Sequence, residues 1–298
     1  MECRLTRRYR LAILQGSNPY LQLSATNDTS IARIQLKAER ARKHLRDLES
    51  EIKAFLGSNP YRVGIKRDPQ TRRLIYYLTS VEEVPESISL IAADVLQNLG
   101  SALDHLAYAL LLVATGGRPG NQAKRVFFPI QEDATEYAGE SRRKLKGLEP
   151  SAIAAIDAIK PYKGGNDLLW RMNQLNRVSK HRSIVMAGSE FRSVDVASGM
   201  LRQIARTDSG WEAAVAAMDL HLFLKPNDSG FPLRQGFELF EDLPDAEADQ
   251  KMQFRFQVAF REPGIIEGDP LLETLRNMAD VVDNVIANLA IFLKPNSP

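Results

Sequence analysis

Apolar residues recur every three or four positions between residues 31 and 56, and this spacing predicts a long amphipathic helix. Its apolar face consists of Ile31, Ile34, Ala38, Ala41, Leu45, Leu48, Ile52 and Phe55. Residues 27–30 (NDTS) offer N-cap side chains, and Gly57 is suited to end the helix. The opposite face carries mixed charges, which we interpret as a solvated surface.

Four further segments follow up to residue 183. The stretches YRVGIKR and RRLIYYLTSV flank the turn sequence DPQT, which predicts a β-hairpin over residues 61–81. A second long helix is predicted over 86–115, and a third begins near Asn166. Residues 116–165, rich in glycine, proline and charge, connect them and hold two shorter helices in ATEYAGESRRKLKGL and PSAIAAIDAI.

Beyond residue 184 the apolar period changes to two, which predicts antiparallel strands with one buried face. In KMQFRFQVAFRE this face consists of Met252, Phe254, Phe256, Val258 and Phe260, and DLHLFL and QGFELFEDL are the expected neighbouring strands. A last helix is predicted over 270–293, capped by Asp269 with Pro270 at its first position. We expect it to pack on the first three long helices.

These elements predict an α+β fold, in which a bundle of long helices carries a small antiparallel β-sheet and the C-terminal helix closes the bundle. The expected segments are a mobile basic tail (1–26), the helical bundle with its inserted hairpin (27–183), the sheet (184–266) and the C-terminal helix (267–298). The hairpin either extends the sheet or stands alone, and we treat the chain as one continuous unit.

Composition narrows the function only slightly. The 298 residues include 39 basic and 37 acidic side chains, so nucleic-acid binding requires a local basic patch. The single cysteine, Cys3, excludes an internal disulfide and a cysteine-based zinc site. No apolar run is long enough for a membrane helix, and the apolar stretch LAIL is too short for a secretory signal. We therefore expect a cytoplasmic protein.

Two helices carry polar columns. In the second long helix the column is Asp94, Asn98, Ser101, His105 and Tyr108, flanked by Gln97 and Asp104. In the third it is Asn173, Arg177 and His181, flanked by Asn176, Lys180 and Arg182. Buried polar groups need partners, so we expect the two columns to face each other. The expected neighbours are Asp94, Asp104 and His105 on one side and Arg177, His181 and Arg182 on the other.

The motifs NLGSALDHL, FPI and LNRVSKHR resemble a family of uncharacterised bacterial proteins, whose members read N-L-R-S-A-L-D-H-L and later N-x-x-D-K-H-R. The resemblance covers most of the chain. Gly100 replaces the arginine of the family pattern, and Ser179 replaces the aspartate. The arrangement is also distantly similar to HEPN domains, helical proteins of bacterial toxin–antitoxin and anti-phage systems, whose arginine and histidine have four to six residues between them. Here three residues separate Arg177 from His181.

The HEPN resemblance implies metal-independent RNA cleavage by a homodimer, without a cofactor. His181 is then the general base or acid, and Arg177 or Arg182 stabilises charge on the phosphate. His105 and Asp104 orient or complement these groups. The expected binding residues are Lys180, Arg182, Asn98 and Asn173.

Three other interpretations stay open at this point. In the first, the polar residues form a structural network that fixes the register of two core helices. Alternatively, the cluster around Arg177, Lys180 and His181 belongs to a non-catalytic module that binds an anionic or protein partner. The third interpretation is a metal-dependent hydrolase with ligands from His105, His181, Asp94 and Asp104. We interpret His44 and His221 as ordinary surface or rim residues.

Overall fold

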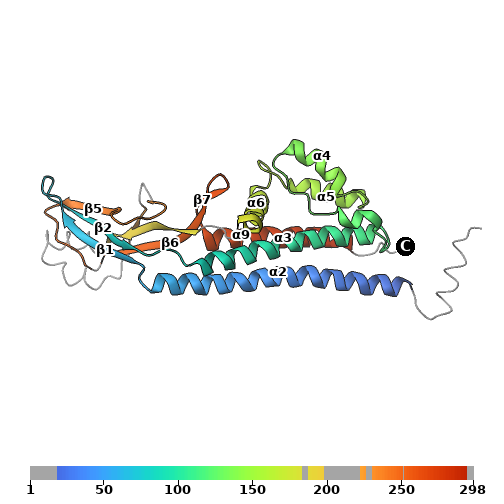
Figure 1. Ribbon diagram of the computed structural model, residues 1–298, viewed down its shortest axis with the longest axis horizontal. Helices are drawn as coiled ribbons and strands as arrows, with labels where there is room; N and C mark the ends of the chain where they lie inside the picture. Colours follow the sequence, from blue (N-terminus) through green and yellow to red (C-terminus); the bar gives the residue numbers. More distant parts are fainter. Residues whose placement is uncertain (1–18, 183–186, 198–221, 226–229, 251, 294–298) are drawn as a thin grey trace, which may run out of the picture. The chain divides into compact units, whose positions relative to one another are not determined.

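The computed structural model describes residues 19–182, 187–197, 222–225, 230–250 and 252–293, without the side chains of 19–30 and 180–182 (Figure 1). The chain is of the α+β class, as predicted. It divides into two compact units, which corrects the expectation of one continuous unit. The helical unit comprises Met1–Arg46, Ile91–Ser183 and Leu275–Pro298, and the strand unit comprises Asp47–Leu90 and Ile184–Thr274.

The four predicted long helices are present. They are α2 (Pro19–Gly57), α3 (Glu86–Ala114), α6 (Asp167–Arg182) and α9 (Leu271–Leu289), and α9 continues into a 3₁₀ turn, η2 (Ala290–Leu293). Helix α2 begins at Pro19, so the predicted N-cap at residues 27–30 and the tail boundary at residue 26 are wrong. No glycine or proline interrupts the chain between Pro19 and Gly57, and Pro19 suits the first position of a helix.

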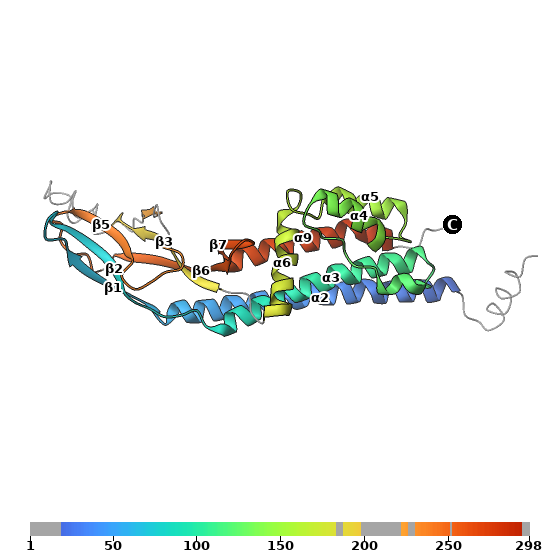
Figure 2. The same ribbon diagram turned by 45° about the horizontal axis from the view of Figure 1, so that its top comes forward.

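Helix α3 lies at the centre of the helical unit. Its side chains at Ala92, Val95, Leu96, Leu99, Leu103 and Leu106 are buried. In that unit α2, α3 and α9 run side by side (Figures 1 and 2). Burial of an apolar side chain stabilises the folded state by roughly 1.5–3 kcal/mol, so this contact between helices is the main source of stability here.

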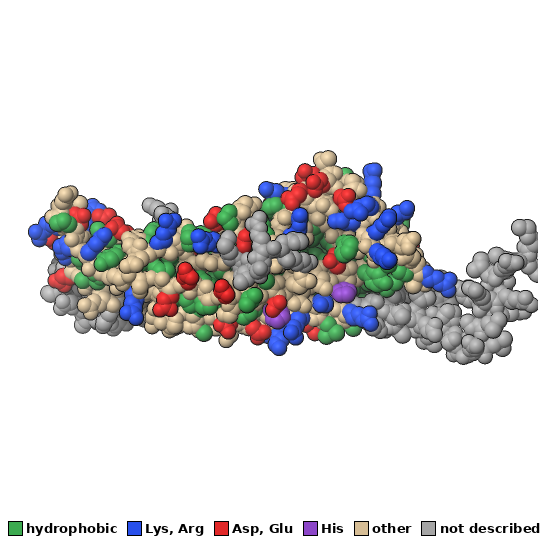
Figure 3. Space-filling model, viewed as in Figure 1, with side chains coloured by type: hydrophobic (Ala, Val, Ile, Leu, Met, Phe, Trp, Pro, Cys, Tyr) green, Lys and Arg blue, Asp and Glu red, His purple; other side chains and the backbone are tan. Residues whose placement is uncertain are grey.

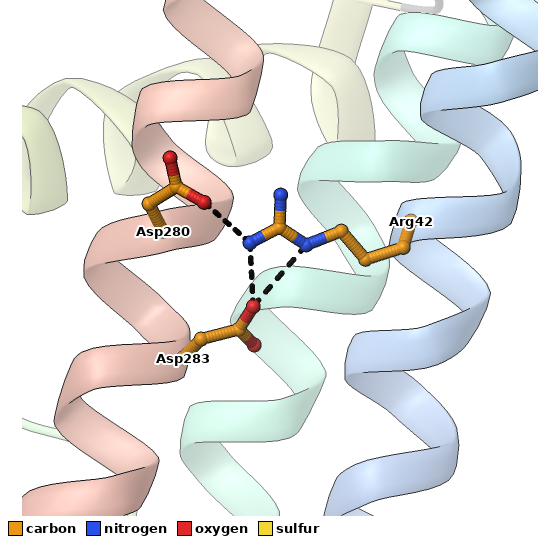
Figure 4. Close-up of polar contacts among 3 residues, drawn as sticks. All are labelled: Arg42, Asp280 and Asp283. Carbon is orange, nitrogen blue, oxygen red and sulfur yellow. Dashed lines mark hydrogen bonds and ion pairs between the residues drawn. The ribbon is translucent and has the colours of Figure 1, made fainter.

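An ion pair joins α2 to α9 and confirms that the last helix packs on the first (Figure 4). Arg42 donates hydrogen bonds to Asp280 at 2.5 Å and to Asp283 at 2.6 Å. Burial lowers the pKa of Arg42, but the hydrogen bonds and charges of the two aspartates outweigh it and raise the pKa above its usual value.

The connecting region contains a 3₁₀ turn, η1 (Gly120–Lys124), and the two predicted short helices, α4 (Ala134–Lys144) and α5 (Pro150–Ile159). Asp133 caps α4 by accepting hydrogen bonds from the backbone of Thr135 and Glu136. The Tyr137 hydroxyl of α4 donates to Asp157 of α5 at 2.6 Å. The cap fixes the start of α4, and the hydroxyl bond joins α4 to α5.

The described residues of the strand unit form two antiparallel sheets, whereas we expected one sheet that the hairpin either extends or leaves to stand alone. The first has the order β1 (Tyr61–Arg67), β2 (Arg73–Val81), β5 (Glu238–Pro244). The second has the order β4 (Phe223–Leu224), β3 (Ala187–Asp195), β6 (Gln253–Glu262), β7 (Ile266–Pro270). The predicted hairpin and the predicted strand at 253–262 are both confirmed. Strand β7 occupies the residues expected to cap and begin the last helix.

The predicted neighbours of β6 are wrong. Strand β5, from QGFELFEDL, pairs with β2, and β4, from DLHLFL, pairs with β3. The partners of β6 are β3 and β7. Side chains connect the two sheets, because the Tyr61 hydroxyl donates to Ser189 at 2.6 Å and the Tyr61 ring lies 4.3 Å from that of Phe256. Alternation identifies a strand and its buried face, but it does not name the partner.

Candidate functional site

Helices α2 and α3 line a surface hollow of the helical unit, with a volume of about 730 Å³. We call it the α2–α3 hollow. Its lining consists of Asp94, Asn98 and His105 from α3 and Arg33, Leu36, Lys37, Arg40 and His44 from α2. Three cationic side chains therefore face a single carboxylate, and the hollow is suited to an anionic ligand.

The helical repeat explains how both helices reach this hollow. On α2 the residues Arg33, Lys37, Arg40 and His44 follow at steps of four, three and four, beside the buried apolar face. The α2 residues and the α3 residues are each spread over eleven residue steps, from 33 to 44 and from 94 to 105, which corresponds to about 16 Å at 1.5 Å per residue. The lining is thus a pair of stripes rather than a point-like site.

The two stripes run in opposite directions, because α2 and α3 are antiparallel within the helical unit (Figures 1 and 2). Asp94 consequently lies toward the His44 end of the hollow, and His105 lies toward the Arg33 end. The carboxylate and the α3 histidine are separated by about 16 Å along the helix. An anion near His105 therefore meets cations of α2 without direct repulsion from Asp94.

Two hydrogen bonds fix side chains in the hollow. The Arg40 Nε–H donates to His44 Nε2 at 3.1 Å, so in this geometry the proton of a neutral His44 resides on Nδ1. The Asn98 amide donates to the Asp94 carbonyl at 2.8 Å. His105 is exposed. Figure 3 shows histidine side chains on one face of the molecule, beside lysine and arginine side chains.

The prediction that the polar columns of α3 and α6 face each other stays a prediction, because the side chains of His181 and Arg182 lie outside the described residues. Asp94 and His105 are exposed and share the hollow with α2. Helix α6 approaches α3 at Gly100, where an added Cβ would lie 2.6 Å from Asn176 Nδ2. At 100° per residue, Gly100 lies about 120–160° around α3 from Asp94, Asn98 and His105, the three column residues that line the hollow. The smallest residue of α3 therefore lies at a contact between the two helices.

Asp104 and Arg177 are also placed outside the hollow. A carboxylate oxygen of Asp104 accepts from the Phe128 backbone N–H at 3.1 Å. Arg177, with its side chain 63% exposed, lies 3.7 Å from Glu132 on α6's flank. Burial lowers the pKa of the Lys144 ammonium, while the charge of Asp104 raises it and that of Arg177 lowers it. These two predicted site residues therefore share a neighbourhood around Lys144.

Glu132 is the centre of the polar contacts on this side of α6. It accepts a hydrogen bond from Trp170 Nε1 at 2.9 Å and another from the Gln174 amide. With Arg177 nearby, its carboxylate has three donors or cations from one helix. We interpret this group as a connection between α6 and the segment before α4, and not as a binding site.

The remaining predicted residues lie on α6. Asn173 is half-buried. Lys180, His181 and Arg182 belong to the last turn of α6, and their side chains lie outside the described residues, as does all of His221. The proximity of His105 to His181 stays a prediction.

Both departures from the bacterial family pattern lie at Asn176. Gly100 lies against the side-chain amide of Asn176, and the Ser179 hydroxyl donates a hydrogen bond to the backbone carbonyl oxygen of Asn176 at 3.0 Å. Asn176 is 7% exposed, and its Oδ1 accepts no hydrogen bond from the part of the chain that the structure describes. The two positions thus belong to one contact between helices.

Sequence reasoning misses the α2 side of the hollow. It assigns the charged run 37–53, which includes Lys37 and Arg40, to a solvated face and His44 to the ordinary surface, and it does not single out Arg33. The available signal is the spacing of these four residues, which places them in one stripe next to the buried face of α2. A stripe on the flank of an apolar face borders the neighbouring helix, whereas a stripe opposite that face meets only solvent.

The chain matches no protein-family model, no curated protein and no solved structure. Within the described ranges, no three His, Cys, Asp or Glu side chains gather as metal ligands. Asp94 and His105, two of the four ligands of the metal hypothesis, are about 16 Å apart along α3 and cannot share one ion. No helix in the described part of the chain is long and apolar enough to cross a membrane.

Proposed function

We propose that the protein binds RNA along the α2–α3 hollow and cleaves it without a metal ion. The observation that supports this function is the pairing of a cationic stripe with an exposed histidine. Arg33, Lys37 and Arg40 line one side of the hollow, and His105 lines the other. Arginine and lysine contact phosphate oxygens, and a histidine near neutral pH accepts and releases protons.

His105 is the general base in the proposed reaction. Its neutral imidazole takes the proton of a ribose 2′-hydroxyl, and the 2′-oxygen attacks the adjacent phosphorus. The bond from phosphorus to the 5′-oxygen breaks, and that oxygen takes a proton from solvent. The products are a 2′,3′-cyclic phosphate and a 5′-hydroxyl end, so no oxidant and no further co-reactant is needed.

The cations of α2 stabilise the charge that develops on the phosphate. Arg33 and Lys37 are the residues at the His105 end of the hollow. Charge-assisted hydrogen bonds to the non-bridging oxygens strengthen as the pentacoordinate phosphorus forms. The HEPN resemblance adds the expectation of a two-fold homodimer, which sedimentation of the purified protein tests.

The second candidate function is a non-catalytic module for an anionic partner, and one observation favours it. Arg40 already donates to the Nε2 atom of His44. His44, the other histidine that lines the hollow, then does not serve as the acid for His105, whereas efficient cleavage of this kind profits from an acid and a base. A module of this kind binds an anion in the α2–α3 hollow but does not cleave RNA.

The deciding experiment incubates the purified protein with an end-labelled RNA in excess EDTA. We expect fragments with cyclic phosphate ends, and none from an RNA with a single 2′-deoxy residue at the cleaved position. The His105→Gln variant should bind the RNA and leave it intact, while His44→Gln, the matched control in the same hollow, should retain cleavage. Equal cleavage by wild type and His105→Gln would contradict the mechanism. Binding without cleavage would favour the second candidate.

A further inference from the structure

Two apolar side chains are exposed beside the cationic stripe. Leu36 lines the hollow and is 62% exposed. Tyr108 is 36% exposed and lies three residues beyond His105, on the same polar column of α3. Scattered exposed apolar residues are ordinary, but here both accompany a site for anions.

Cations next to exposed aromatic or aliphatic groups are typical of sites for single-stranded nucleic acid. The cations follow the phosphates, and the apolar groups contact the faces of unpaired bases. In a duplex the base faces are stacked inside, so Leu36 and Tyr108 would gain no contact from it. We infer that the α2–α3 hollow selects single-stranded RNA, with its phosphates on Arg33, Lys37 and Arg40 and a base on Tyr108.

The placement of the groups predicts which part of the RNA strand faces each helix. The phosphates follow α2, because all three cations of the hollow belong to that helix. The bases lie toward α3, which contributes the uncharged Asn98 to the lining and carries Tyr108 about one turn beyond His105, outside the lining itself. Asp94 repels phosphate at the His44 end, so the strand's phosphates lie between Arg33 and Arg40 and do not extend to His44.

This inference rests on the binding part of the proposed function, and a ligand that cannot be cleaved separates the two. The probe is a fluorescent 2′-O-methyl RNA, used as a single strand and as its duplex in anisotropy titrations. We expect the single strand to bind at least about 10-fold more tightly than the duplex. Three phosphate contacts predict a slope near −2 for log affinity against log salt, from about −0.7 each on a single strand.

The aromatic contact is tested by Tyr108→Ala, with Tyr108→Phe as the variant that keeps the ring. Tyr108→Ala should weaken single-strand binding on the order of 10-fold and leave duplex binding unchanged, and Tyr108→Phe should bind like wild type. Phe127→Ala, which removes an exposed aromatic outside α2 and α3, is the matched control. Circular dichroism checks that each variant folds.

Two results would overturn the inference. One is equal or tighter binding of the duplex, and the other is an equal loss of affinity in Tyr108→Ala and Phe127→Ala. If the single strand is selected through Tyr108 but native RNA is not cut, the inference holds and the proposed cleavage fails. If native RNA is cut and the duplex is preferred, the cleavage holds and the inference fails.

Discussion

Helix α3 presents two different polar surfaces, one toward the α2–α3 hollow and one toward α6. On the hollow side, His105 and Asp94 are exposed. On the α6 side, Gly100 contacts Asn176, and Asp104 accepts a backbone hydrogen bond. The first surface leaves polar groups accessible to a ligand, and the second uses them for packing. Helical spacing identifies polar columns, whereas burial decides which column is available for binding.

The largest effect should come from substituting His105, because the rate of RNA cleavage should depend on this residue and not on its neighbour on the other surface of α3. His105→Ala should slow RNA cleavage by about 10²- to 10⁴-fold, the usual contribution of a general base, with little change in affinity. Asp104→Asn, one residue away on the other surface, should leave the cleavage rate within a few-fold of wild type. Single-turnover rates measure both. A greater loss of rate in Asp104→Asn than in His105→Ala would reverse the comparison.

The next effect concerns salt. For three phosphate contacts, raising the salt concentration from 50 to 200 mM should weaken single-strand binding by roughly 20-fold. The triple variant Arg33→Gln, Lys37→Gln, Arg40→Gln should lose most of this dependence. Lys43→Gln with Arg46→Gln removes two exposed cations of the same helix that do not line the hollow, and it should retain the dependence. Identical salt slopes for the two variants would show that net charge alone attracts the ligand.

A substitution at the α6 contact should alter stability and spare binding. Gly100→Leu introduces a side chain whose Cβ would lie 2.6 Å from Asn176 Nδ2. We expect a loss of about 1–3 kcal/mol in the free energy of unfolding, as for other overpacked contacts, measured by urea denaturation. RNA affinity of the folded variant should be unchanged. Unaltered stability together with weaker RNA binding would place the ligand on the α6 surface instead.

Arg42 provides a smaller test on α2 itself. It is a cation close to the hollow residues in sequence, but it is paired with Asp280 and Asp283 (Figure 4). Because the pair is partly exposed, Arg42→Ala should cost only about 0.5–1 kcal/mol of unfolding free energy. It should leave the salt slope of RNA binding intact, and a reduced slope would extend the binding surface to Arg42.

The smallest effect is a pH dependence away from both surfaces of α3. Burial, and then the hydrogen bond to Asp157, raise the pKa of Tyr137 above its ordinary value of 10.0. The folded protein holds this proton more tightly than the unfolded chain does, so stability falls as pH rises above about 10. In Tyr137→Phe this fall should be smaller, as measured by urea midpoints at pH 8 and pH 10.5. The same slope in wild type and variant would contradict the assignment.

Much of the fold is predictable from local sequence signals. The apolar stripe of α2, the DPQT turn and the alternation in β6 each specify an element through its own residues. The partner of β5 is not predictable, because QGFELFEDL alternates in the same way whether it joins β2 or β6. The start of α2 is missed because polar N-cap residues also occur inside helices when no proline or glycine stops them.

The sequence predicts which residues of α3 form a polar column, but it does not predict which neighbouring helix lies beside that column. The column through Asn98 and His105 follows from spacing alone. Asp94, Asn98 and His105 of that column line the hollow with α2, and α6 approaches α3 at Gly100. The resemblance to the bacterial family pattern marks Gly100 as a departure. Its role as a packing position becomes visible only when the position of α6 is known. His44 is missed as a site residue because its place in the hollow depends on α3, the neighbouring helix, and not on the sequence of α2 alone.

The most direct test of the account is to cross-link RNA to the protein and locate the contacts. A single-stranded RNA containing 4-thiouridine, irradiated in the complex and analysed by mass spectrometry of peptides, reports which residues touch the strand. We predict cross-links within residues 33–44 and 94–108, with Tyr108 among the modified side chains. Cross-links confined to other segments, such as residues 171–182 of α6, would contradict the claim that the α2–α3 hollow binds RNA.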